Sequence, residues 1–216
     1  MRIEWLNKTG NGRVILFFNG WGMDGQAVKH LKCQSDVLMF YDYRSLELGA
    51  LPDLGAYREV IIVAWSMGVW ATAQFLTTRN IRSLKQIALN GTERPVDDHY
   101  GIPVRVYALT EKGMTEKGRE KFVARMLDGR TEHPVTEFTC RPIGEVCEEL
   151  SRIREKSAVL QSVLAWDKVY ISEQDVIFPV AGQQAWWTER GAKIQMLSGG
   201  HFPFFQFESW EEIVGE

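Results

Sequence analysis

Short apolar runs alternate with helical patterns along most of the chain. Arg13–Phe18 (RVILFF) and Glu59–Trp65 (EVIIVAW) are continuous apolar runs, as expected of strands that are buried on both faces of a sheet. The second run is rich in β-branched residues, which favour strands. Arg2–Leu6 would add an edge strand, and the pattern predicts five more strands: Asp36–Tyr41, Leu84–Leu89, Val104–Leu109, Lys168–Ser172 and Lys193–Leu197.

Helical patterns lie between these strands. Val69–Thr78 directly follows the Glu59–Trp65 run, Gly182–Glu189 precedes the last strand, and Glu208–Val214 closes the chain. Strands that alternate with helices imply right-handed crossovers and a parallel sheet. The sequence therefore predicts an α/β fold whose mostly parallel sheet carries helices on both faces.

One stretch, at about 111–166, breaks this alternation. It contains no clear strand, and Thr115–Leu127 and Glu145–Ala165 look helical, with one densely charged face. We interpret the stretch as a helical insertion in a single domain of residues 1–216. Two solvated helices packed on the sheet would give the same pattern, but an insertion between late strands favours a cap over the active site.

Composition narrows the function classes. The chain has 216 residues, 45% of them hydrophobic, and a formal net charge of -3, so nothing indicates a nucleic-acid partner. No apolar run could span a bilayer, and the first residues lack the layout of a signal peptide. Three cysteines, Cys33, Cys140 and Cys147, fit neither a disulfide framework nor a zinc pattern. We expect a cytoplasmic monomer without a membrane partner.

The segment Ala64-Trp65-Ser66-Met67-Gly68 is the sharpest local feature. It follows a strand and opens a helix, and it resembles the nucleophile elbow G-x-S-x-G with alanine in place of the first glycine. Small flanking residues are needed there because strand and helix approach closely. Ser66 is therefore the candidate nucleophile, although a serine that only caps a helix would look similar.

A serine nucleophile needs a base, and His201 is the best placed of four histidines. It lies in Ser198-Gly199-Gly200-His201-Phe202-Pro203, just after the last strand. Active-site groups of such sheets gather at the carboxyl ends of the strands. The alternatives are that His201 is a surface loop residue, or that His99 is the base, while His30 and His133 have a weaker context. Phe202, Phe204 and Phe205 could wall the site.

A carboxylate should orient the histidine, and in chain order it should lie between Ser66 and His201. The segment Ser172–Pro179 follows a strand and contains Glu173 and Asp175. Asp175 is preferred because Val176 and Ile177 suggest a partly buried loop, in which an aspartate needs a partner. Glu173 remains the second candidate.

An oxyanion hole needs two amide donors. One is the amide after the nucleophile, at Met67, and the other should lie in a loop after an early strand. Glycines on both sides of Trp21 in Phe18–Asp24 let the backbone approach a ligand, so the Trp21 amide is the second candidate. A glycine-rich turn without a ligand is the alternative. No dinucleotide fingerprint, metal-ligand spacing or cofactor motif is present, so none of these groups is expected.

Four segments together resemble the BioG family: Phe17–Asp24, Tyr41–Tyr43, Ala64–Gly68 and Gly200–Phe204. The resemblance covers nearly the whole chain. It implies an α/β-hydrolase fold and the hydrolysis of pimeloyl-acyl-carrier-protein methyl ester in biotin synthesis. It also implies a Ser66–His201–Asp175 triad with the Trp21 and Met67 amides as oxyanion hole, and acyl carrier protein as partner.

An acidic carrier protein would prefer a basic surface. The insertion holds two basic groups, interleaved with glutamates: Arg119, Lys121 and Arg125, and then Arg152, Arg154 and Lys156. Solvated helix faces would look the same. Trp21, Trp65 and Trp70 could line an acyl channel or belong to the core. A general carboxylesterase or thioesterase, a non-catalytic acyl-binding protein and an interaction protein built on the insertion remain open.

Overall fold

The computed structural model describes residues 1–79, 81–158 and 164–215, and within them the strands form one sheet. The strand order is β1-β3-β2-β4-β5-β6-β7, and every neighbouring pair is parallel except β1 with β3. The strands are β1 (Arg2–Asn7), β2 (Arg13–Phe18), β3 (Asp36–Tyr41), β4 (Glu59–Trp65), β5 (Lys85–Leu89), β6 (Lys168–Ser172) and β7 (Ile194–Leu197). The expected mostly parallel sheet with an N-terminal edge strand is confirmed.

The central strands are buried because both faces of the sheet are covered. Along β2, Val14, Leu16 and Phe18 belong to one apolar cluster, whereas Ile15 and Phe17 belong to the cluster on the opposite face. Each of these five residues is fully buried. The continuous apolar run of β2 thus fills two cores at once, as the sequence predicts.

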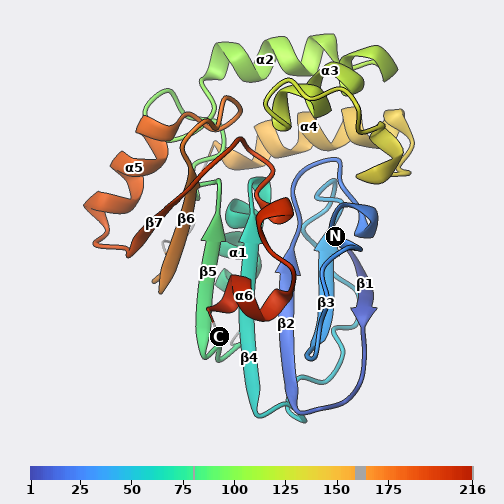
Figure 1. Ribbon diagram of the computed structural model, residues 1–216, viewed down its shortest axis with the longest axis vertical. Coiled ribbons are helices and arrows are strands. Elements are labelled where there is room, and N and C mark those ends of the chain that lie inside the picture. Colours follow the sequence, from blue (N-terminus) through green and yellow to red (C-terminus); the bar gives the residue numbers. More distant parts are fainter. Residues whose placement is uncertain (80, 159–163, 216) are drawn as a thin grey trace.

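Helices cover the two faces (Figure 1). Helices α1 (Met67–Thr77) and α5 (Val180–Glu189) pack on the face of Leu16. The opposite face carries α6 (Trp210–Val214) and two 3₁₀ turns, η1 (Gly25–Val28) and η3 (Phe204–Gln206). Across the described residues, no helix has both the length and the apolar character that crossing a membrane requires.

The strand expected at Val104–Leu109 is wrong, because the segment forms helix α2 (Val104–Gly113). The helix begins after Pro103, and the Asp98 carboxylate accepts a hydrogen bond from the Val104 amide at 2.9 Å. Tyr107 is the buried residue of α2, whereas Leu109 is 61% exposed. The alternating valines at positions 104 and 106 resemble a strand pattern. A segment of ten residues with a single buried side chain is instead typical of a helix on the surface.

Three helices lie across the carboxyl ends of the central strands, at the top of Figure 1. They are α2, α3 (Glu116–Met126) and α4 (Ile143–Ser157), with the short turn η2 (Val135–Glu137) before α4. Helix α3 confirms the helix expected at Thr115–Leu127. Helix α4 confirms only the first part of the helix expected at Glu145–Ala165, because it ends at Ser157 and Leu164 and Ala165 lie outside any helix. Residues 159–163 of the second expected helix lie outside the described residues.

The helical state of α2 predicts opposite effects of two substitutions. Leu109→Lys should change the free energy of unfolding by less than about 0.5 kcal/mol, because the side chain already faces solvent. Tyr107→Phe should cost about 1 kcal/mol, because the buried hydroxyl donates to the Leu150 carbonyl at 2.8 Å. Urea unfolding measures both. A loss of several kcal/mol in Leu109→Lys would contradict the helix and favour a buried strand.

Candidate active site

Ser66 sits on a strained turn between β4 and α1. Its backbone has φ 58 and ψ -123, and its amide donates to the Leu89 carbonyl of β5 at 2.9 Å. The turn is tight: a Cβ on Gly68 would lie 2.1 Å from the Phe18 carbonyl oxygen of β2. Ser66 occupies the N-cap position of α1, but its side chain makes no capping hydrogen bond. The Ser66 hydroxyl is therefore free to contact a group outside α1.

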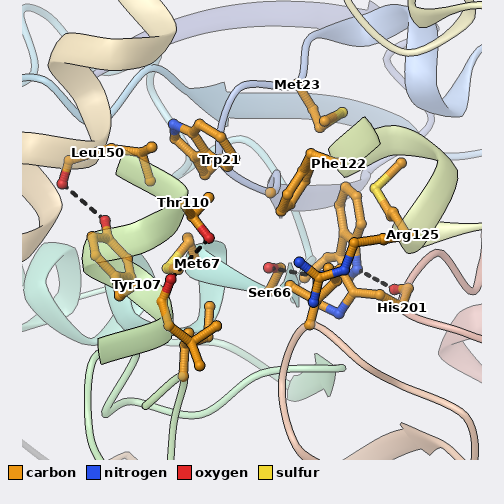
Figure 2. A pocket seen from close by; sticks show the side chains of 16 residues that line it. Trp21, Met23, Ser66, Met67, Tyr107, Thr110, Phe122, Arg125, Leu150 and His201 are labelled. Carbon is orange, nitrogen blue, oxygen red and sulfur yellow. Dashed lines mark hydrogen bonds between the residues drawn. The ribbon is translucent and has the colours of Figure 1, made fainter. Parts of the chain in front are cut away.

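The Ser66 hydroxyl contacts a histidine from the loop after β7, an edge strand of the sheet. Ser66 Oγ lies 2.8 Å from His201 Nε2, and His201 Nδ1 lies 2.8 Å from Asp175 Oδ2. Figure 2 shows the Ser66 and His201 side chains directed toward each other at the wall of a pocket. A carboxylate only accepts, so Nδ1 carries the proton and Nε2 is free to accept from the serine. His99, the rival base, is exposed.

Asp175 is held by several donors. Its Oδ1 accepts from the Ile177 and Phe178 amides, each at 2.9 Å, and its Oδ2 accepts from Gln183 Nε2 at 3.1 Å. The side chain is 4% exposed. Glu173, the second candidate, is exposed, so the structure brings Asp175 and not Glu173 to His201. Gln183 lies inside α5, and its sequence context gives no signal of this contact.

The backbone of His201 is fixed as firmly as its ring. Its carbonyl accepts from Trp65 Nε1 at 3.0 Å and from Asn90 Nδ2 at 2.9 Å. Asn90 Oδ1 in turn accepts from the Ser172 amide at 2.7 Å, so the Asn90 side chain links the ends of β5 and β6 to the histidine loop. Sequence reasoning missed Asn90. Its place directly after a predicted strand, at the same sheet edge as the triad, was the available signal.

The residues of the two expected oxyanion donors lie at the same pocket as Ser66. Trp21 and Met67 both line the pocket together with Ser66. Within the described ranges, neither the Trp21 amide nor the Met67 amide donates to a protein acceptor. Gly20 permits the close approach of this loop, because a Cβ there would lie 2.7 Å from the Trp65 ring. Both amides are thus available to a ligand.

The pocket is narrow and largely apolar. Its cavity volume is only about 30 Å³. Much of its apolar wall comes from the helices above the sheet, through Val106, Tyr107, Phe122, Met126 and Leu150. Figure 2 shows that side chains from α2, α3 and α4 surround the catalytic groups. Such an apolar lining is typical of sites that bind apolar ligands.

Not every expected wall residue lines this pocket. Trp21 and Trp65 do, but Trp70 is buried in the core beside Tyr43. Phe202 and Phe204 pack edge-to-face on Trp65 in the opposite core cluster, and Phe205 is 41% exposed, so the expected aromatic wall after His201 is wrong. The Phe202 and Phe204 rings instead pack against the Trp65 ring in the core.

A buried ion pair lies beside the loop of Trp21, and sequence reasoning missed it. Arg141 Nη1 donates to Glu149 Oε2 at 2.7 Å, and both side chains are almost fully buried. Burial raises the pKa of the Glu149 carboxyl above its ordinary value, and the Arg141 charge acts in the opposite direction. The surface-like charge pattern of α4 concealed that one glutamate faces inward.

In a comparison with known protein families, one family model matches almost the whole chain. The model of the family described as pimeloyl-ACP methyl esterase BioG matches residues 1–213. The crystal structure of BioG from Haemophilus influenzae is 32% identical, has a TM-score of 0.87 and is matched over 99% of both chains. A bromoperoxidase from Bacillus anthracis, at 13% identity and a TM-score of 0.66 over 98% and 93% of the two chains, shares the α/β-hydrolase fold.

A third match is a longer protein. A protein of Bacteroides fragilis described as malonyl-[acyl-carrier protein] O-methyltransferase is 38% identical over 193 residues, which is 88% of this chain. The aligned part spans only 39% of that relative's length. The similarity therefore concerns one portion of a longer protein.

The close approach at Gly68 predicts a sharp difference between two glycine substitutions. Gly68→Ala should lower the free energy of unfolding by about 1–3 kcal/mol and displace Ser66, since its Cβ would collide with the Phe18 carbonyl. Gly113→Ala, at the end of α2, has nothing within 4 Å and should cost no stability. Chemical denaturation compares them. Equal stabilities of the two variants would show that the turn can relax.

Proposed function

The chain belongs to the BioG family of pimeloyl-ACP methyl esterases, and on this basis we propose that it hydrolyses pimeloyl-acyl-carrier-protein methyl ester to the free acid and methanol. As a member of this family it is a carboxylic ester hydrolase that serves biotin synthesis. The observation that carries the proposed chemistry is the hydrogen-bonded series Ser66–His201–Asp175 at an apolar pocket.

In the proposed acylation step, His201 Nε2 accepts the Ser66 proton while Oγ attacks the ester carbonyl carbon. The Trp21 and Met67 amides donate to the carbonyl oxygen as it becomes an oxyanion. The bond to the methoxy group then breaks, and His201 returns the proton so that methanol leaves. The acyl chain remains as an ester of Ser66.

In the proposed deacylation step, water takes the position of methanol. His201 accepts a proton from the water, hydroxide adds to the acyl carbon, and the same amides stabilise the second oxyanion. Collapse restores Ser66 and releases the free carboxylic acid. Asp175 remains ionised throughout and stabilises the imidazolium that forms in each half-reaction.

Two observations support a carrier-bound methyl ester as substrate. The pocket is narrow and apolar, which suits a linear acyl chain with a small alcohol group at its end. The Bacteroides fragilis relative is described as a methyltransferase that acts on an acyl group of acyl carrier protein. Such an enzyme makes a methyl ester on a carrier-bound acid, and an esterase can later remove it.

Helices α2, α3 and α4 act, in this proposal, as a cap. They lie over the carboxyl edge of the sheet and supply one side of the pocket wall (Figures 1 and 2). A cap of this kind excludes water from the acyl chain and strengthens the hydrogen bonds to the oxyanion. This favours the cap over two helices that merely pack on the sheet.

The proposed docking surface for acyl carrier protein is a basic row on α3. Lys117, Lys121 and Arg125 follow at intervals of four residues, all are exposed, and in the described part of the chain none contacts a carboxylate. Arg125 also lines the pocket. The row therefore leads from the surface to the catalytic groups, as an acidic carrier with a long acyl arm requires.

Several other basic side chains of the insertion are held by protein partners, and within the α3 row Arg125 Nη2 donates to the Val176 carbonyl at 3.2 Å. Arg119 pairs with Glu116 and donates to the Arg141 carbonyl. The remaining contacts are Arg152 with Glu155, Arg154 with Glu111, and Lys156 with the Arg44 carbonyl. These side chains are structural in this interpretation, so docking depends on α3.

A general carboxylesterase or thioesterase is the second candidate function, since the same triad would serve it. The preference between carrier-bound and small esters separates the two. Membership of an esterase family argues against a non-catalytic acyl-binding protein. A role of the insertion in protein interaction alone is not needed, because its helices contribute to the pocket wall.

The first prediction for this function concerns the nucleophile. Wild type should cleave pimeloyl-acyl-carrier-protein methyl ester in strong preference to a short p-nitrophenyl ester. Ser66→Ala should lower kcat by at least about 10³-fold with both substrates, and circular dichroism should show an unchanged fold. An active Ser66→Ala protein would refute the triad, and equal use of the two esters would favour the general esterase.

The acid of the triad is compared in the same assay with a matched neighbour. Asp175→Asn should lower kcat by about 10³-fold or more, because the histidine loses the acceptor that fixes its tautomer. Glu173→Gln removes an exposed carboxylate two residues away and should leave kcat unchanged. The reverse pattern would assign the acid to Glu173.

The docking surface makes a third prediction. Lys121→Glu should raise KM for the carrier-bound ester by about threefold or more and leave turnover of the p-nitrophenyl ester unchanged. The effect should shrink at high salt, as screening requires. Lys193→Glu, an exposed control at the amino end of β7, should alter neither substrate. An unchanged KM in Lys121→Glu would remove α3 from the docking surface.

A further inference from the structure

A buried carboxylate of α4 reaches down to the loop that carries Trp21. Glu149 is 0% exposed, and its Oε2 accepts a hydrogen bond from the Gly22 amide at 3.2 Å. Its Oε1 accepts from the Tyr43 amide at 2.7 Å. Gly22 directly follows Trp21, so one side chain of the cap joins the loops after β2 and β3.

The same helix also contacts the loop through Trp21 itself. Trp21 Nε1 donates to the Val146 carbonyl at 2.9 Å. Gly22 has a φ of +73, and a Cβ there would lie 3.2 Å from Val146 Cγ1, so the peptide lies directly against the helix. Val146 and Glu149 are three residues apart and therefore share one face of α4. That face holds the loop both at the ring of Trp21 and at the next peptide.

A lone negative charge behind this loop would oppose an oxyanion that forms in front of it. Arg141 prevents this, because its Nη1 donates to Glu149 Oε2 at 2.7 Å and its Nη2 lies 3.1 Å from Asp42 Oδ1. The Arg141 side chain is only 3% exposed. The Glu149 carboxylate can thus accept from two backbone amides while its charge is compensated locally.

We propose that Glu149 is a positioning residue for catalysis, which fixes the loop of Trp21 so that the Trp21 amide meets the oxyanion. The inference rests on the proposed role of that amide. Oxyanion donors accelerate a reaction because they are oriented beforehand, and a displacement of about 1 Å can cost about a hundredfold in rate. Gly22 and Trp21 Nε1 are the two points at which α4 sets this orientation.

Glu149→Gln tests the inference at nearly constant volume. Three donors point at the carboxylate, from Gly22, Tyr43 and Arg141, and the amide has a single acceptor oxygen for them. The loop should shift, and kcat should fall about tenfold or more while KM changes less than about threefold. A trifluoromethyl ketone, which binds as an oxyanion adduct of the nucleophile, should lose affinity in parallel. Binding of the product acid should not change.

Glu145→Gln is the matched control. Glu145 lies one turn earlier on α4 and pairs with Arg2 and Arg44. It also lies 3.9 Å from Arg141 Nε, but Arg141 keeps its shorter contacts with Glu149 and Asp42 in this variant. The variant should retain the wild-type kcat and inhibitor affinity. All rates are divided by the number of sites that a fluorophosphonate labels at completion, so a loss of folded protein does not count as a loss of catalysis.

A wild-type kcat and ketone affinity per labelled site in Glu149→Gln would overturn the inference. Should that variant fail to fold, Glu149→Asp, which keeps the charge near Arg141 but withdraws it from the loop, is judged by the same criteria. The assay uses a p-nitrophenyl ester, so it remains decisive even if the carrier-bound ester is not the substrate. The proposed function and the role of Glu149 can therefore fail separately.

Discussion

The strained turn at Ser66 is the constraint on which the arrangement of the site depends. A non-glycine residue with φ 58 costs free energy and persists only where its surroundings determine it. Here β4 is buried on both faces, α1 packs on the sheet, and Gly68 lies against the Phe18 carbonyl of β2. The close contact between the start of α1 and the end of β2 places the nucleophile beside the loop of Trp21.

The remaining groups reach Ser66 because parallel strands end at one edge of the sheet. Asn90 after β5, Asp175 after β6 and His201 after β7 lie next to one another there, and their mutual hydrogen bonds join loops that are far apart in sequence. Trp65 Nε1 also donates a hydrogen bond to the His201 carbonyl. The position of the base is therefore set by its backbone as well as by its ring.

The sequence was sufficient where local pattern decides structure. Apolar runs located the strands, and chain order with strand ends located Ser66, Asp175 and His201, which the fold brings together. It was misleading at Val104–Leu109, where a capping contact from Asp98 and one buried tyrosine produce a helix. It was silent on Glu149, Arg141 and Gln183, because their burial arises from partners distant in sequence, which no local pattern encodes.

The contacts of α4 have a consequence for how this fold can diversify. The helix accepts hydrogen bonds from the Trp21 ring and from the amide of the next residue, Gly22. Helices α2 and α3 contribute pocket-lining side chains such as Val106 and Phe122. In the proposed function, α4 therefore belongs to the frame that positions the Trp21 amide, whereas α2 and α3 form an exchangeable part of the pocket wall. Under that proposal, substitutions in α2 and α3 can change which acyl group is accepted, while α4 and the loop that it holds must change together.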